Sequence, residues 1–147
     1  MRSEEILNGD NYHPRVLMQV FARDHVVVCG TDEVIALIRQ CAFHPETIEI
    51  HSLRDGEEVD EWETVMTIEG DYADFAHLET IYLGILARQS RIATNVRRVV
   101  KAANGKPVLF FPARYDIYQT QESDGYAALV GGIHGFSTDA NALAAGG

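Results

Sequence analysis

The sequence predicts an α/β fold, because short apolar runs of the strand type alternate with segments of helical periodicity. Residues 25–29 (HVVVC) form a β-branched run that ends at Gly30, and a helical pattern opening with Thr-Asp-Glu follows from Thr31. Residues 107–111 (PVLFF) form an apolar run that is too short for a helix and is typical of a parallel strand covered on both faces. A single strand and helix cannot cover their own apolar faces, so we expect similar units beyond this chain.

Length and composition indicate a soluble protein with a substantial core, since the chain has 147 residues, 46% hydrophobic and 23% charged. The N-terminus lacks a signal-peptide core, and no apolar run approaches the roughly 18 residues of a membrane span. We therefore expect a cytoplasmic protein without a membrane partner. A formal net charge of -10 argues against non-specific nucleic-acid binding. Cys29 and Cys41 lie in apolar patterns without metal-ligand spacing, which predicts two buried thiols.

Three further elements are expected in the first half of the chain. Asp10 is a suitable cap for a helix whose apolar positions are Val16, Leu17, Val20 and Phe21. Residues 47–53 and 62–69 alternate between apolar and polar side chains, which predicts two half-buried strands. Residues 44–79 hold twelve Asp and Glu. We interpret this acidic run as a solvated edge and hairpin without a metal, because it lacks the spacing of a calcium loop.

The stretch from Thr80 to Arg114 contains no Asp or Glu, but it holds seven of the twelve Lys and Arg residues. Such a one-sided charge suits an anion. Periodicity predicts one helix from Leu78 and a second over residues 92–103, ending at a glycine C-cap. Gly84 lies inside the first helix, where glycine is unfavourable, so we expect close backbone packing there.

Arg114 directly follows the apolar run at residues 107–111. In parallel α/β folds, groups at the C-terminal end of a strand face the ligand crevice, which makes Arg114 the leading candidate for a site residue. The alternative is a surface arginine at the start of a loop. A helix over residues 124–130 is expected next, ending at Gly131 and Gly132.

Residues 78–94 (LETIYLGILARQSRIAT) resemble the nicotinate phosphoribosyltransferase family, which is related in fold to the quinolinate phosphoribosyltransferases. Residues 10–15 (DNYHPR) resemble the family's N-terminal Asp-x-Tyr-x-x-Arg, and residues 68–72 (IEGDY) resemble the strand before its Leu-Glu-Thr helix. PVLFFPAR at 107–114 and Ser-Thr-Asp at 137–139 follow in the family's order. The resemblance covers nearly the whole chain, but only the N-terminal part of a family member.

This resemblance implies an α+β, sandwich-like N-terminal domain at residues 1-105 and the first strand-helix units of an incomplete α/β barrel at residues 106-147. It implies that nicotinate displaces pyrophosphate from phosphoribosyl pyrophosphate to give nicotinate mononucleotide, a step of NAD salvage. It also implies Mg²⁺ bound with the phosphates, possible coupling to ATP hydrolysis, and a homodimer or higher homo-oligomer with shared sites. The reaction needs cations for a carboxylate and for phosphates.

Within the resemblance, Arg114 matches a catalytic-site arginine that holds the nicotinate carboxylate. Tyr12 and Arg15 match positions that reach toward a site in the neighbouring subunit; the alternative is a contact at a helix start. Thr80 stands where quinolinate enzymes have an arginine for a dicarboxylate, which favours the monocarboxylate nicotinate.

Two further residues are assigned by the resemblance. His134 is expected to contact a phosphate or the ring. Glu79 is expected to orient arginines across a subunit interface, and a helix-dipole role near a helix N-terminus is the alternative.

Two other functions are compatible with parts of the sequence. One is a catalytically silent fragment that binds an anion or a partner subunit through the basic stretch. The other is a small-ligand regulatory module built on residues 25–69, which explains only the first half of the chain.

Overall fold

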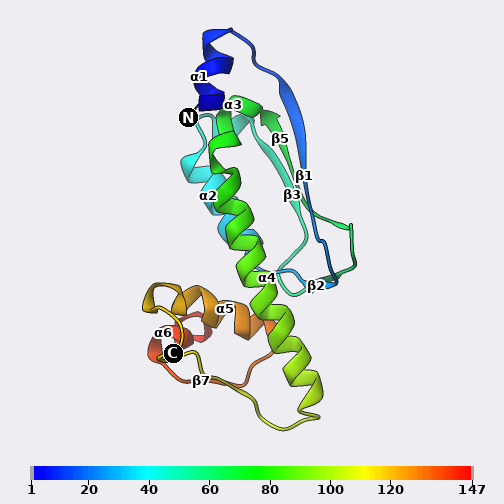
Figure 1. The fold of residues 1–147 in the computed structure, drawn as a ribbon, viewed down its shortest axis with the longest axis vertical. Helices are drawn as coiled ribbons and strands as arrows, with labels where there is room; N and C mark the ends of the chain where they lie inside the picture. The colour runs from blue at the N-terminus through cyan, green and yellow to red at the C-terminus, as the bar shows by residue number, and fades with distance from the viewer. Residues whose placement is uncertain (1, 147) are drawn as a thin grey trace.

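A computed structural model describes residues 2–146, and it shows an elongated α+β molecule organised along one long helix (Figure 1). The helices are α1 (Arg2–Gly9), α2 (Thr31–Cys41), α3 (Tyr72–Phe75), α4 (Glu79–Ala102), α5 (Gln121–Gly131) and α6 (Asp139–Ala142). The strands are β1 (Arg15–Phe21), β2 (Val26–Val27), β3 (Glu49–Ser52), β4 (Glu58–Val59), β5 (Thr64–Asp71), β6 (Leu109–Phe110) and β7 (Gly135–Phe136). The sheet and α2 lie beside the first half of α4, and the C-terminal elements lie beside its second half.

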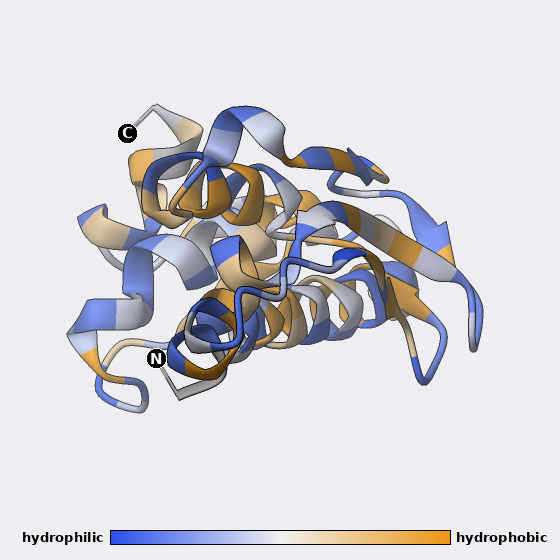
Figure 2. Ribbon diagram, turned by 90° about the horizontal axis from the view of Figure 1, so that it is seen from above, coloured by the Kyte–Doolittle hydropathy of each residue, from blue (hydrophilic) through white to orange (hydrophobic). Residues whose placement is uncertain are grey.

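The main sheet has the order β1-β5-β3, with both neighbouring pairs antiparallel. Its inner face packs on α2 and α4 through a core that includes Ile38, Ile68, Phe75 and Tyr82, each at most 1% exposed. Figure 2 shows hydrophobic segments turned toward the interior and hydrophilic ones toward the outside. The strands predicted at residues 47–53 and 62–69 are confirmed as β3 and β5, and the helix predicted from Thr31 is confirmed as α2.

The helix expected between Asp10 and Phe21 is wrong, because residues Arg15–Phe21 form strand β1. Burial alternates along β1, and the inward-facing positions Val16, Met18 and Val20 pack against the core. This two-residue period competes with the helical spacing in the same residues, and pairing with the whole of β5 favours the strand. A short helix, α1, instead forms in the polar residues that precede it.

The two helices expected between Leu78 and Ala103 form one continuous helix of 24 residues, α4. The apolar pattern is interrupted midway because α4 buries polar side chains there. The Ser90 hydroxyl accepts the Cys29 N–H at 3.0 Å, and the Thr94 hydroxyl accepts the Val27 N–H at 2.9 Å. These bonds satisfy the backbone of β2 and its continuation, so a polar face of α4 is buried without cost from unpaired donors.

Three local expectations are also corrected. Gly84 is not packed closely, since a Cβ placed there meets nothing within 4 Å. Cys29 is buried, and burial raises its thiol pKa to about 12, but Cys41 is exposed. The strand expected at residues 107–111 forms as β6 and pairs in parallel with β7, yet Leu109 is 68% exposed, so β6 is not covered on both faces.

Candidate substrate-binding site

Arg114 lies in the loop that leaves the C-terminal end of β6. Its backbone has φ 71, a left-handed conformation that non-glycine residues seldom adopt. The preceding turn is closed by the Pro112 carbonyl, which accepts the N–H groups of Tyr115 at 3.0 Å and Asp116 at 3.1 Å. The Arg114 side chain is exposed, and no ion pair within residues 2–146 involves it. It is therefore available to an external anion.

An ion pair between the partly exposed Arg88 and the buried Asp124 joins the other end of the same loop to α4. Arg88 donates from Nε to Asp124 Oδ1 at 2.8 Å and from Nη2 to Asp124 Oδ2 at 2.7 Å, while Asp124 is only 1% exposed. The Thr120 hydroxyl donates to Asp124 at 2.9 Å and accepts from Arg88 at 3.2 Å. This planar, two-bond geometry, together with the Thr120 hydroxyl, fixes the start of α5 relative to α4.

His134 precedes β7, and its N–H donates to the Val108 carbonyl at 3.2 Å. His134 lies at the start of β7, and Arg114 follows the end of β6. Because β6 and β7 are parallel, these two residues lie at opposite edges of the strand pair. Ser137 lies at that edge, and its N–H donates to the Phe110 carbonyl at 3.1 Å. Its buried hydroxyl has no hydrogen-bond partner within residues 2–146. Ser137 is thus a site candidate that sequence reasoning did not select, although the Ser-Thr-Asp motif contains it.

Four expected site residues lie at the other end of the molecule. Tyr12 is 61% exposed in the loop before β1, and Arg15 begins β1. Glu79 and Thr80 begin α4, beside α3. Figure 1 shows the start of β1 and the start of α4 near α1, far along the long axis from β7. The structure therefore does not bring these residues together with Arg114 and His134 within one chain.

Arg15 and Glu79 each have a structural role within this chain. Arg15 pairs with Glu69 on β5 and with Glu49 on β3, each at 2.8 Å, and the hydrogen bond to Glu69 raises the pKa of Arg15. Glu79 occupies the first turn of α4, whose Leu78 cap offers no side-chain hydrogen bond, so it compensates the positive helix end. The helix start expected at Arg15 is replaced by a strand start.

Three of the seven basic residues of the stretch, Arg88, Arg97 and Lys101, pair with acids from elsewhere in the chain. Glu58 on β4 lies 3.0 Å from Arg97 and 3.4 Å from Lys101, and these charges lower its pKa, with Lys101 the larger cause. Arg88 is neutralised by Asp124, as described above. Residues 80–114 are one-sided in charge along the sequence, but in the folded chain acids from other segments pair with some of these cations. Only the remaining cations are free to bind an external anion.

Fold and site together define a class: an α+β domain that leads into a parallel strand pair with an uncommitted arginine after its first strand. The family model described as quinolinate phosphoribosyl transferase, N-terminal domain, matches residues 5–90, and the chain belongs to this family. No curated protein matches the sequence. None of the helices in residues 2–146 combines the length and hydropathy that a membrane-spanning helix needs.

Solved structures extend the similarity. Nicotinate-nucleotide pyrophosphorylase from Pyrococcus furiosus is 32% identical, with a TM-score of 0.87 over 98% of this chain and 36% of that chain. The enzyme of the same name from Francisella tularensis is 20% identical, with a TM-score of 0.75 over 91% of this chain and 50% of that chain. Human nicotinic acid phosphoribosyltransferase is 14% identical, with a TM-score of 0.81 over 97% of this chain and 35% of that chain.

The last two structures show a shared fold alone, because their identities are low. The chain spans about a third to a half of the length of these structures. The expected α+β fold is confirmed, and the expected family is confirmed at the broader level of the quinolinate phosphoribosyl transferase N-terminal domain.

Proposed function

We propose that the chain forms the N-terminal part of a phosphoribosyltransferase of NAD biosynthesis that joins a pyridine carboxylate to phosphoribosyl pyrophosphate. The family match over residues 5–90 carries this proposal. It is supported by the Pyrococcus furiosus structure, whose name refers to nicotinate nucleotide and pyrophosphate, at 32% identity over 98% of the chain. The elongated arrangement around α4, with an exposed strand pair at its far end, suits a part that is completed by further barrel strands.

We assign nicotinate as the pyridine substrate. Thr80 is exposed at the start of α4, and it stands where the resemblance places an arginine in enzymes of the dicarboxylate quinolinate. A hydroxyl at this position leaves the second carboxylate of quinolinate without a cationic partner.

In the proposed reaction, the pyridine nitrogen forms a bond to C1 of the ribose while the bond from C1 to pyrophosphate breaks. The electron pair of the broken bond leaves with pyrophosphate, so the protein has little proton transfer to perform. Arg114 holds the nicotinate carboxylate through two parallel N–H bonds, which keeps the ring nitrogen oriented. Ser137 lies at the Arg114 edge of the strand pair and is a secondary candidate for a contact to the phosphates, whereas His134, which the resemblance assigns to a phosphate or the ring, lies at the opposite edge.

Mg²⁺ and ATP belong to the proposal through the family resemblance. We propose that Mg²⁺ binds together with the phosphates of phosphoribosyl pyrophosphate, since Mg²⁺ is commonly held by substrate phosphates and only one or two carboxylates. Coupling to ATP hydrolysis stays a proposal without a residue assigned to it.

The placement of Tyr12 and Arg15 supports a site shared between two subunits. The start of β1 lies at the end of the long axis opposite to β7, as a contact with a pyridine site in a second copy would require. We therefore propose a homodimer or higher homo-oligomer, in a soluble, cytoplasmic setting.

A quinolinate-specific enzyme is the second candidate, because the matching family model carries the quinolinate name. The two candidates are separated by steady-state kinetics of the complete gene product with each pyridine substrate, phosphoribosyl pyrophosphate and Mg²⁺. We expect kcat/KM for nicotinate to exceed that for quinolinate by at least about a hundredfold, since a site without a second cation loses a charge-assisted pair. A preference for quinolinate overturns the assignment of nicotinate.

A further inference from the structure

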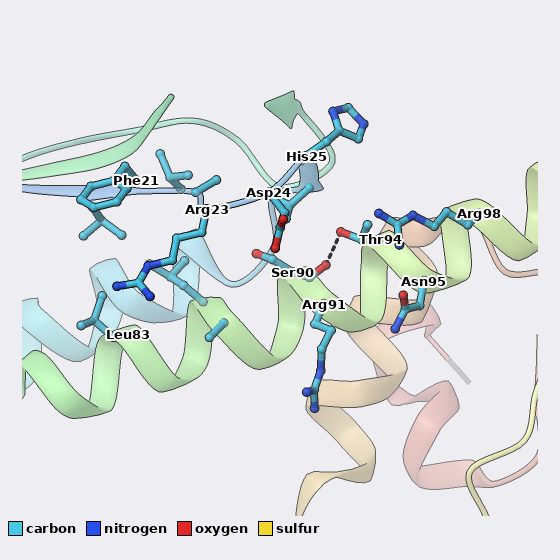
Figure 3. A pocket seen from close by; sticks show the side chains of 16 residues that line it. Phe21, Arg23, Asp24, His25, Leu83, Ser90, Arg91, Thr94, Asn95 and Arg98 are labelled. Carbon is cyan, nitrogen blue, oxygen red and sulfur yellow. Dashed lines mark hydrogen bonds between the residues drawn. The ribbon is translucent and has the colours of Figure 1, made fainter. Parts of the chain in front are cut away.

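A cavity of about 750 Å³ lies between α4 and the connection from β1 to β2, apart from the Arg114 loop (Figure 3). Its volume lies in the range of pockets that hold small organic ligands. One wall is a stripe of α4 at helical spacing: Leu83, Ala87, Arg91, Asn95 and Arg98. The opposite wall runs from Val20 through Val26, with Val65 of β5 also in contact.

One end of the cavity carries large apolar side chains, and the other end is more polar. Figure 3 shows Phe21 and Leu83 at the first end, with the Arg23 side chain reaching toward Leu83, and Thr94, Asn95 and Arg98 at the other. Phe21 is 41% exposed and Leu83 is 39% exposed, so apolar surface is left open to solvent at the first end. Such an arrangement suits a ligand that joins an apolar body to an anionic group.

Three arginines line the cavity without internal partners. No ion pair or side-chain hydrogen bond within residues 2–146 involves Arg23, Arg91 or Arg98. By contrast, Arg88 and Arg97 on the same helix are paired with carboxylates. The cations that remain unneutralised in the basic stretch of α4 are therefore those at this cavity.

Other polar groups of the cavity are either committed or face elsewhere. The hydroxyls of Ser90 and Thr94 already bind the backbone of residues 27–29. His25 binds Asp60 at 2.9 Å and turns away from α4 (Figure 3). Asp24 is the one acidic residue among the lining residues, and it points toward Ser90, away from Arg98. The lining thus keeps an excess of two positive charges when histidine is neutral.

We propose that this cavity is a second ligand site, which binds an organic anion with an apolar body and a carboxylate or phosphate head. The apolar body contacts Phe21 and Leu83, and the head is held by Arg98 with Asn95. Arg23 lies near Leu83, and Arg91 points away from the β1 to β2 connection (Figure 3), so these two cations add positive charge at the edges of the cavity. None of the lining residues belongs to the Arg114 loop, because they come from the middle of α4, from β5 and from the segment between Val20 and Val26.

The single tryptophan of the chain offers a direct reporter. Trp62 packs against Phe21 with ring centroids 5.3 Å apart, and Phe21 lines the cavity. We propose to titrate the 147-residue chain with 4-phenylbutyrate, 4-phenylbutyl phosphate and the neutral 4-phenylbutanamide, following Trp62 fluorescence and calorimetric heat. Inorganic phosphate and acetate test the two heads without an apolar body.

We expect at least one of the two amphipathic anions to bind with a Kd of about a millimolar or tighter. The amide and the two small anions are expected to bind at least about tenfold more weakly. The amide lacks the anionic head, and inorganic phosphate and acetate lack the apolar body. The relative affinity of the carboxylate and the phosphate identifies the head that the site prefers. Absence of binding by both amphipathic anions, or equal binding by the amide, overturns the proposal.

Matched variants locate the binding. Arg98→Gln is expected to weaken the amphipathic anion by about tenfold, and Leu83→Asp by a similar factor, whereas Lys106→Gln removes a cation outside the cavity and leaves affinity unchanged. Arg114→Gln is also expected to leave this affinity unchanged, which separates the cavity from the proposed nicotinate site. Equal weakening by Arg98→Gln and Lys106→Gln overturns the site. Circular dichroism confirms that each variant is folded before titration.

Discussion

At the scale of single residues, Asp55 connects three parts of the molecule. Its carboxylate accepts the N–H groups of Gly30 at 3.0 Å and Thr31 at 2.9 Å, and so supplies the cap of α2 from a distant turn. It also accepts the hydroxyls of Thr31 at 2.7 Å and Tyr126 at 2.9 Å, and burial together with this bond raises the pKa of Tyr126. The Thr-Asp-Glu pattern correctly predicted the start of α2 at Thr31, but local sequence contains no signal for the partner Asp55.

Removing this carboxylate should destabilise the fold. We expect Asp55→Ala to lower the free energy of unfolding by about 2–3 kcal/mol, because it leaves a helix cap and a partly buried hydroxyl unpaired. Urea denaturation measures the change. Asp32→Ala, an exposed acid in the same helix turn, is the control and should cost less than about 1 kcal/mol. Equal costs for the two variants contradict this role of Asp55.

His44 predicts a pH dependence of stability. The hydrogen bond to Asp74, at 2.8 Å, raises the pKa of His44 above its ordinary value. A raised folded-state pKa contributes stability that is complete below the unfolded pKa of about 6.5 and is lost as pH rises through the folded pKa. The Tm difference between wild type and His44→Gln should therefore be larger at pH 5.5 than at pH 8.5. A difference that is constant or grows with pH contradicts the role of the pair.

Arg114 was identified from its place after an apolar run, and the structure leaves it exposed and without an ion pair in residues 2–146. In the complete gene product, Arg114→Lys should weaken nicotinate binding by roughly 1.5–3 kcal/mol, because a lysine cannot form the two parallel bonds. Binding of phosphoribosyl pyrophosphate should change less. Calorimetric titration of both ligands checks this, and equal weakening removes the assigned role.

At the scale of elements, periodicity predicted those segments whose apolar residues face one core. The helix α2 and the strands β3 and β5 are of this kind. The pattern was ambiguous in β1, where helical and strand spacing coexist and only pairing with β5 decides. It was misleading in α4, where Ser90 and Thr94 face buried backbone of β2 and divide the apolar stripe. Such partners are distant in sequence, so a local pattern does not reveal them.

Two glycines in helices provide a matched test of this account. A Cβ at Gly125 in α5 would collide with the backbone of Asn141 in α6, whereas a Cβ at Gly84 in α4 meets nothing within 4 Å. We expect Gly84→Ala to stabilise the fold by up to about 1 kcal/mol. Gly125→Ala should destabilise it by at least about 2 kcal/mol, because backbone must move. Thermal unfolding of both variants checks the signs, and destabilisation by Gly84→Ala contradicts the open environment of that residue.

At the scale of the whole molecule, the candidate residues lie at the two ends of the long axis (Figure 1), which a local sequence pattern does not reveal. The sequence indicated Arg114 as a candidate and an anion as the ligand, because both inferences depend only on neighbouring residues. It did not show that Glu58 and Asp124 pair with three cations of the basic stretch, since those contacts join distant segments. Nor did it show that Tyr12 and Arg15 lie at the opposite end from β7. The family match supports the proposed phosphoribosyltransferase activity, and the 36% coverage of the Pyrococcus furiosus structure supports a site completed by further residues.

We propose that residues 1–147 contribute half of a phosphoribosyltransferase site, and that most phosphate contacts come from barrel strands outside this segment. The most direct measurement is the formation of nicotinate mononucleotide from nicotinate, phosphoribosyl pyrophosphate and Mg²⁺, followed by chromatography with and without ATP. We predict that the complete gene product forms the nucleotide and that residues 1–147 alone are at least about a thousandfold slower, since they lack those phosphate contacts. Robust activity of residues 1–147 alone, or none in the complete gene product, would contradict the claim.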